Sequence, residues 1–259
     1  MAINPEKVCF ARGDEAFREI VRKATFHVCD GAGTAAAVRI LWGVKIPRIT
    51  GIELFFQMLA VAEEEDLCAF LLGARPEAIE RARQALRERH PRLRVAGCLD
   101  GYFHEDESES VVQEINASGA DMLFVALGSP KQERWIARYR SMLETPFCMG
   151  VGGSFDVLSG RVKRAPRVFR RTGTEWLYRL AREPWRWRRQ TALIGFALSV
   201  LREKFRLPQP RLYRQGRHAE IEEGAVSGVA QSSSASRDNG TTRSDSVRSQ
   251  LLSTHSAGD

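Results

Sequence analysis

The sequence has 259 residues, and 43% of them are hydrophobic, which is enough to build a globular core. Its formal net charge is +7, and the excess is local, because residues 161–206 contain fourteen Lys and Arg against three Glu. This charge predicts an anionic partner, and nucleic acid, anionic lipid headgroups and phosphorylated ligands all fit it.

Membrane spans and disulfides are not expected. The longest apolar run, residues 191–201, has about half of the roughly 20 residues that a spanning helix needs, and no signal-like segment opens the chain. The cysteines are odd in number, and no two are spaced as CxxC. They therefore predict reduced core residues of a cytosolic protein, at Cys9, Cys29, Cys68, Cys98 and Cys148.

Short apolar runs alternate with segments of helical period along the first 160 residues. We expect strands near 25–29, 46–49, 68–72, 93–97, 121–127 and 146–151. We expect helices near 14–23, 33–42, 51–64, 76–89, 108–118 and 130–142. This alternation predicts an α/β fold with a doubly wound, mostly parallel, Rossmann-like sheet that binds ligands at the carboxyl ends of its strands.

The composition predicts three parts. Residues 1–160 form the α/β core, and residues 161–206 form a basic, aromatic-rich helical appendage. Residues 216–259 are rich in Ser, Gly, Thr, Arg and Asp, with too few large apolar side chains to offset chain entropy, so this tail is predicted to be disordered.

Residues 27–40 place Asp30 at the end of a predicted strand, before a glycine turn. A carboxylate at this position could act as a general base, although a turn or cap aspartate is the simpler interpretation. The pattern GxGxxA through Gly31, Gly33 and Ala36, with Glu53 beyond it, also suggests a dinucleotide site. That match is weak, because Asp30 would face the pyrophosphate and Glu53 lies in a helical run.

Residues 124–139 predict a strand that ends at Gly128 and a helix that follows at once. Ser129 can cap this helix, and Pro130 suits its first position, where a missing N–H costs nothing. Gln132 and Glu133 then fall in the first turn, where free N–H groups could face a diphosphate or a sugar.

Two further stretches have competing interpretations. The acidic run at 104–110 could bind a metal, but it more often represents a solvated helix start, which we favour. Gly152 and Gly153 follow the last predicted strand and permit close approach of the backbone to a ligand, although core packing also explains their surroundings.

The basic stretch interleaves arginines with aromatic side chains. Such a mixture is typical of a helix at a lipid headgroup layer and equally of base stacking on single-stranded nucleic acid. A purely solvated helix would leave the tryptophans unexplained. The aromatic residues are Phe169, Trp176, Tyr178, Trp185 and Trp187.

Four motifs together resemble the WecG/TagA/CpsF glycosyltransferase family: CDGAGTAAAVR, GCLDGYF, LGSPKQERWI and the long run that begins GVGGSFDVLSGRVKRAP. The resemblance covers residues 4–206. It implies an enzyme that moves a sugar from a UDP-sugar to a sugar on a polyprenyl diphosphate, with inversion, a β-1,4 link, no metal and no cofactor. It also implies a role in cell-surface polysaccharide biosynthesis and peripheral binding to the cytoplasmic face of the bacterial membrane.

The resemblance also assigns site residues. Asp30 matches the general base, Gln132 a pocket glutamine and Arg48 an active-site arginine, which gives the catalytic set. Arginines of the appendage would reach the diphosphate and replace a metal. The expected substrate-binding residues are Asn4, Asp100, Tyr102, Ser129, Lys131, Glu133, Gly152, Gly153, Arg179, Arg186 and Arg189.

The amino-terminal end departs from the family pattern. Members carry about thirty residues before the asparagine that matches Asn4, with a threonine two positions upstream of it, where Ala2 stands here. The resemblance therefore implies a truncated amino terminus.

Alternatives and open points remain at this stage. The main alternative is a nucleic-acid-binding α/β protein that uses the Arg/Trp stretch, and a weaker one is an NAD-linked enzyme built on Gly31 and Gly33. The transferred sugar is left open, because N-acetylmannosaminuronate, N-acetylmannosamine and glucose transferases share these motifs. A homo-oligomer is compatible with the sequence.

Overall fold

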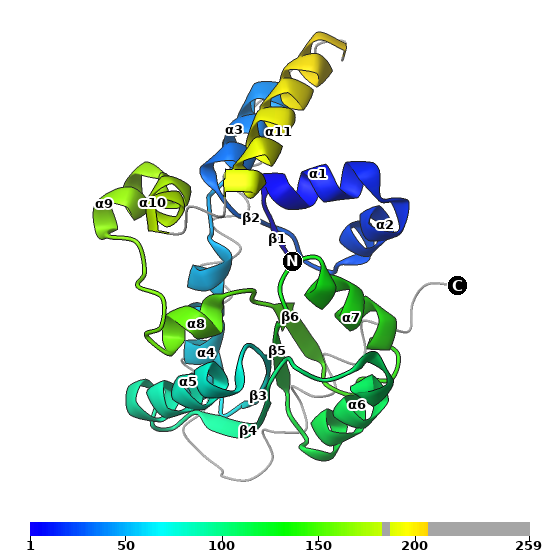
Figure 1. Ribbon diagram of the computed structural model, residues 1–259, viewed down its shortest axis with the longest axis vertical. Helices are drawn as coiled ribbons and strands as arrows, with labels where there is room; N and C mark the ends of the chain where they lie inside the picture. The colour runs from blue at the N-terminus through cyan, green and yellow to red at the C-terminus, as the bar shows by residue number, and fades with distance from the viewer. Residues whose placement is uncertain (183–186, 207–259) are drawn as a thin grey trace, which may run out of the picture. The chain divides into compact units, whose positions relative to one another are not determined.

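Four parallel strands form the larger of the two sheets in the structure, which is a computed structural model. It describes residues 1–182 and 187–206, except for the side chains of 170, 171, 179, 187–191 and 206. The strand order is β4-β3-β5-β6, and every pairing is parallel (Figure 1). The strands are β3 (Cys68–Gly73), β4 (Arg94–Leu99), β5 (Met122–Ala126) and β6 (Phe147–Gly150).

Helices cover both faces of this sheet because its central strands are apolar on both sides. Ala69 and Leu71 of β3 point to the face under α4 (Gly51–Glu64), α5 (Pro76–Arg89) and α8 (Ser154–Leu158). Phe70 and Leu72 point to the opposite face, which is covered by α6 (Ser108–Ala117) and α7 (Lys131–Tyr139) (Figure 1). The two-residue alternation of a strand thus divides the core into two apolar layers.

A second, small sheet lies in the amino-terminal part of the chain. Its strands are β1 (Ala2–Ile3) and β2 (Val28–Cys29), which pair in parallel. Asp30 N–H donates to Ile3 O at 2.8 Å, and Ile49 N–H donates to Cys29 O at 3.0 Å. The helices of this part are α1 (Pro5–Gly13), α2 (Glu15–Lys23) and α3 (Ala32–Trp42).

The carboxy-terminal described helices are α9 (Arg167–Thr172), α10 (Glu175–Arg182) and α11 (Trp187–Arg206). Helix α11 packs against α1 and α3 (Figure 1). Phe196 and Val200 of α11 are buried there with Ala37 of α3. A buried apolar contact therefore joins the basic carboxy-terminal part of the chain to the amino-terminal helices.

The predicted α/β class with parallel, helix-covered sheets is confirmed, but two expectations about strands are wrong. The single expected sheet is two, and the segment 46–49 forms no strand, since only Ile49 pairs with β2. Strand β1 and helix α1 were not expected. The described residues fall in one compact unit, so the division at residue 160 stays a prediction. The predicted disordered tail, 216–259, lies outside the described residues.

The five cysteines are free thiols, but only Cys68 is buried, and the other four are partly exposed instead of lying in the core. Burial raises the pKa of Cys98 and Cys148 to about 11. Neither side chain is therefore a thiolate nucleophile near neutral pH.

Gly73 ends β3 and is paired in register with Ala126 of β5. It has φ +117°, and an added Cβ would lie 2.6 Å from the carbonyl carbon and oxygen of Ala126. We expect Gly73→Ala to lower the free energy of unfolding by about 2–4 kcal/mol, from backbone strain and overpacking together. Gly13→Ala is the control, because nothing lies within 4 Å of that added atom. Urea unfolding followed by circular dichroism measures both variants, and equal stability of the two would contradict the prediction.

Candidate active site

The carboxyl ends of β3, β4, β5 and β6 line one cavity of about 700 Å³. The chain leaves β3 toward β4 and leaves β5 toward β6, so the sheet has its topological switch point between β3 and β5. Crevices at such points are the usual ligand sites of parallel α/β sheets. The residues that line it are Ala74, Arg75, Gly101, Tyr102, Phe103, His104, Ala126, Leu127, Gly128, Lys131, Gly152, Gly153, Asp156 and Arg161.

The charged side chains of this lining are mostly cationic, and two aromatic rings lie among them. Arg75, Lys131 and Arg161 contribute cations, and Asp156 contributes the only carboxylate among the lining residues, 3.3 Å from Arg161. Lys131 Nζ lies 5.8 Å from the centre of the Phe103 ring. The cavity is therefore suited to an anionic ligand that carries a flat or apolar group.

The DGYF segment, residues 100–103, reaches this cavity through Gly101, Tyr102 and Phe103. Asp100 Oδ1 accepts a hydrogen bond from Tyr102 N–H at 2.8 Å, which closes a tight turn after β4. Tyr102 is 68% exposed and lines the cavity, whereas Asp100 does not line it and instead holds the turn. Lys131, Gly152 and Gly153, also expected to bind substrate, line the same cavity.

Asp30 and Arg48 lie in a second cluster, at the small sheet, and neither lines the cavity. The Asp30 carbonyl accepts from Thr34 Oγ1 at 3.3 Å, and an added Cβ at Gly51 would lie 3.7 Å from Asp30 Oδ2. Burial raises the pKa of the neighbouring Cys29 thiol, the Asp30 charge adds to the rise and the Arg48 charge opposes it. The Asp30 carboxylate and the Arg48 guanidinium therefore both lie close enough to the Cys29 thiol to shift its pKa.

The turn between α9 and α10 lies against this second cluster. Gly173 has φ +74°, and an added Cβ would lie 2.9 Å from Ala32 Cβ and 3.4 Å from Arg48 Nη1. The start of the basic appendage thus reaches Arg48. Arg186 lies outside the described residues, and so do the side chains of Arg179 and Arg189, so their approach to a diphosphate stays a prediction.

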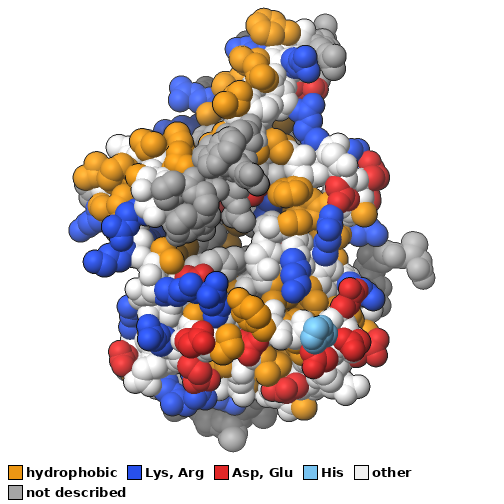
Figure 2. Space-filling model, in the orientation of Figure 1, with side chains coloured by type: hydrophobic (Ala, Val, Ile, Leu, Met, Phe, Trp, Pro, Cys, Tyr) orange, Lys and Arg blue, Asp and Glu red, His pale blue; other side chains and the backbone are white. Residues whose placement is uncertain are grey.

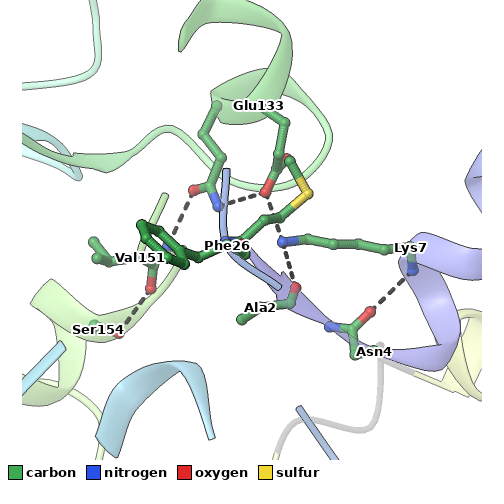
Figure 3. Close-up of polar contacts among 10 residues, drawn as sticks. Ala2, Asn4, Lys7, Phe26, Glu133, Val151 and Ser154 are labelled. Atoms are coloured by element: carbon green, nitrogen blue, oxygen red, sulfur yellow. Dashed lines mark hydrogen bonds and ion pairs between the residues drawn. The ribbon is translucent and has the colours of Figure 1, made fainter. Parts of the chain in front are cut away.

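A buried polar network surrounds the first turn of α7 (Figure 3). Glu133 Oε1 accepts from Gln132 Nε2 at 2.8 Å and forms an ion pair with Lys7 Nζ at 2.8 Å. Gln132 Oε1 accepts from Gly152 N–H at 3.0 Å. Gln132 is 2% exposed and Glu133 4% exposed, so both side chains face protein and not the cavity.

Two details of this strand-to-helix junction differ from expectation. Helix α7 begins at Lys131, and Pro130 occupies the N-cap position one residue earlier than its predicted place. Ser129 does not cap the helix, and its buried Oγ has no hydrogen-bond partner among the described residues. A proline at the N-cap removes the side-chain acceptor that a serine there would have offered.

Asn4 forms the N-cap of α1, and its Oδ1 accepts from Lys7 N–H at 2.9 Å. Sequence reasoning missed α1, although an asparagine before Pro5 is a standard signal for a helix start. It also missed three cavity residues, Arg75, Asp156 and Arg161. Only Arg75, three residues after the predicted strand 68–72, carried a signal from its position in the sequence.

The glycines that follow Asp30 are required by the local backbone and by close packing. Gly31 has φ +97° at the N-cap of α3, and an added Cβ at Gly33 would lie 3.0 Å from Pro5 Cγ. Glu53 closes a capping box with Thr50 and pairs with Arg164 at 2.9 Å. These contacts account for the residues that suggested a dinucleotide site.

The acidic run at 104–110 starts a helix. Glu105–Glu107 forms a short 3-10 helix that leads into α6, and Glu105 pairs with Arg138. Within residues 1–182 and 187–206, no group of three or more His, Cys, Asp or Glu side chains is placed to hold a metal ion.

Comparison with known proteins assigns the family. The model of the glycosyl transferase WecG/TagA/CpsF family matches residues 1–210. The chain belongs to this family. It is 36% identical over 202 residues to the N-acetylglucosaminyldiphosphoundecaprenol N-acetyl-beta-D-mannosaminyltransferase of Bacillus subtilis (strain 168), and the match covers 78% of each chain.

Membership of the WecG/TagA/CpsF family makes the chain a glycosyltransferase. It selects the enzyme over the nucleic-acid-binding alternative. The residue roles that the resemblance assigned stay predictions, and the geometry divides these residues among the cavity, the cluster at Asp30 and the buried network at Gln132.

Gly173 allows a test of the appendage contact. We expect Gly173→Ala to weaken the packing of the α9–α10 turn on Ala32 and Arg48, because the new methyl group would collide there. Trypsin should then cleave within 161–182 about ten-fold faster, since local opening becomes more frequent.

Gly160→Ala is the matched control for Gly173→Ala. Gly160 has φ +73°, so the backbone strain is the same, but nothing lies within 4 Å of the added atom. Equal cleavage rates of the two variants would show that the turn does not depend on this contact.

Proposed function

We propose that this glycosyltransferase moves a sugar from a UDP-sugar to a sugar on a polyprenyl diphosphate, with inversion at the anomeric carbon. The cavity at the carboxyl ends of the four strands is the single observation that carries the proposal. Its volume of about 700 Å³ falls within the range of roughly 300–1,000 Å³ that small-molecule sites occupy.

The donor nucleotide lies in this cavity. Arg75, Lys131 and Arg161 supply the cations that two phosphates require, and the rings of Tyr102 and Phe103 provide flat surfaces for a base. Gly152 and Gly153 present backbone without side chains, which lets a ligand approach closely.

The acceptor is lipid-linked and meets the donor at Asp30. The name of the Bacillus subtilis relative includes N-acetylglucosaminyldiphosphoundecaprenol, a sugar on a polyprenyl diphosphate. This name supports an acceptor of the same chemical class for the present chain. The Asp30 carboxylate takes the proton of the acceptor hydroxyl, whose oxygen attacks the anomeric carbon of the donor. The bond from that carbon to the diphosphate breaks, and UDP leaves with the electron pair.

Arginines offset the charge that grows on the leaving UDP. Arg48 lies beside the Asp30 cluster, and the turn at Gly173 brings the start of the appendage to within contact of it. The appendage residues Arg179, Arg186 and Arg189 follow and approach the diphosphates of donor and acceptor.

The enzyme binds the inner surface of the cell membrane through α11. Within the described ranges, 1–182 and 187–206, no helix is long and apolar enough to cross a bilayer. Helix α11 exposes an apolar stripe on the side away from α1 and α3, where Figure 2 shows hydrophobic side chains at the surface. Phe205, the largest side chain of the stripe, is 84% exposed. The stripe consists of Ile194, Leu198, Leu201 and Phe205. A helix with such a stripe and flanking basic residues suits a lipid headgroup layer.

Asp30→Asn tests the catalytic proposal. We expect transfer, measured as UDP release with a short-chain polyprenyl-diphosphate sugar as acceptor across a panel of UDP-sugars, to fall at least about 100-fold, because the amide accepts no proton. UDP binding, measured by calorimetry, should stay within about two-fold, since the cavity does not contain this residue.

Asp66→Asn is the matched control for Asp30→Asn. Asp66 is an exposed turn residue with φ +55°, a conformation that asparagine tolerates well. It should keep full activity. Full activity of Asp30→Asn would remove the general base from the mechanism, and failure of the wild-type chain to bind UDP would remove the donor site.

The membrane proposal predicts the behaviour of a stripe variant. We expect Leu198→Gln with Phe205→Gln to bind anionic liposomes at least about ten-fold more weakly, because each side chain loses apolar contact with the lipid. Ala197→Gln, exposed on the same helix outside the stripe, should bind normally. Equal flotation of all three proteins, or binding to single-stranded RNA instead of liposomes, would contradict this surface.

A further inference from the structure

Lys7 is a buried lysine to which the proposed reaction gives no role. Its side chain is among the most buried charged groups of the described residues, with 5% of the residue exposed. Burial of an ammonium group is unfavourable unless the group is paired and hydrogen-bonded. Lys7 meets both conditions, because Nζ pairs with Glu133 Oε1 and donates to Ala2 O at 2.8 Å.

The ion pair connects Lys7 to the wall of the cavity in three steps. Glu133 Oε1, held by Lys7, accepts from Gln132 Nε2. Gln132 Oε1 then accepts from Gly152 N–H. Gly152 lines the cavity with Gly153. A continuous chain of polar contacts thus runs from α1 to the site proposed for the donor.

Gln132 has little freedom in this arrangement. An added Cβ at Gly150 would lie 2.6 Å from Gln132 Nε2, so the amide packs directly on the end of β6. Gly152, two residues later, turns with φ +54°. The position of the Gln132 amide therefore helps to set the path of the chain as it leaves β6 and enters the cavity wall.

Glu133 is held through one oxygen. Lys7 and Gln132 both contact Oε1, whereas the buried Oε2 has no hydrogen-bond partner among the described residues. Removal of the ammonium group would leave the carboxylate with a single donor and freedom to rotate. The hydrogen bond to Gln132 and the one from Gly152 would then weaken in turn.

We propose that Lys7 is a positioning residue for the donor cavity, which it shapes through Glu133, Gln132 and the Gly152–Gly153 turn. The inference rests on the proposed function for the identity of the ligand. A buried ion pair is often no more stabilising than an apolar pair of the same size. We therefore assign to this ion pair the role of fixing the orientation of the Glu133 carboxylate.

Lys7→Met tests the proposal by two measurements on the full chain. The first is hydrogen exchange of Gly152 N–H, followed by NMR with isotope-labelled glycine, with Gly119 N–H as internal reference because it donates to Asn116 O in a distant turn. The second is the dissociation constant of UDP by calorimetry. We expect exchange at Gly152 to rise about ten-fold and UDP to bind about ten-fold more weakly, with Gly119 unchanged.

Arg134→Met is the matched control for Lys7→Met. Arg134 also lies on α7 and also pairs with the amino-terminal helices, through Asp14, but this ion pair is partly exposed to solvent. Exposed pairs contribute little, so neither measurement should change. A merely structural Lys7 would lower the melting temperature and leave both measurements on the folded protein unchanged.

The outcomes separate this proposal from the proposed function. Wild-type exchange at Gly152 in Lys7→Met, or unchanged UDP affinity despite faster exchange, overturns the role of Lys7. No UDP binding by the wild-type chain overturns the donor site, and the exchange result alone then decides whether Lys7 holds the turn. If Lys7→Met fails to fold, Lys7→Met with Glu133→Gln leaves no unpaired buried charge, and the same two changes are expected of it.

Discussion

One buried ion pair, between Lys7 of α1 and Glu133 of α7, links the amino-terminal helices to the helix that follows β5. It joins the amino-terminal part, with the small sheet, to the large sheet. The same ammonium group binds Ala2 O, so β1 is fixed by the contact that fixes α7. Because paired charges tolerate little change in distance or direction when buried, the two parts of the fold are held in a defined orientation.

That orientation matters because the predicted functional groups are divided between the two parts. The cations and aromatic rings of the cavity follow the strands of the large sheet, whereas Asp30 and Arg48 follow or flank the small one. A transfer reaction needs donor and acceptor atoms within bonding distance and in line. Small changes in the angle between the sheets would therefore affect rate more than binding.

Sequence patterns predicted the large sheet well, because strands such as β3 and β5 are continuous apolar runs and helices such as α4 carry complete caps. They did not predict β1, since two residues carry no periodicity. Nor did they predict that the Gln132 amide is buried against Glu133 and Gly152, because a motif identifies residues and not the direction of their side chains. The catalytic role of Gln132 stays a prediction. Lys7 gave no signal, because its partner lies far along the chain and only the tertiary fold brings the two together.

Helix α11 is apolar on two opposite sides, one buried on α1 and α3 and one exposed. A surface helix usually has one apolar side, which is buried on the core, so the second apolar side of α11 leaves a hydrophobic patch exposed to water. Purified without lipid or detergent, such molecules tend to associate through that side. The amphiphile chosen for storage therefore determines whether the preparation contains dispersed molecules or aggregates.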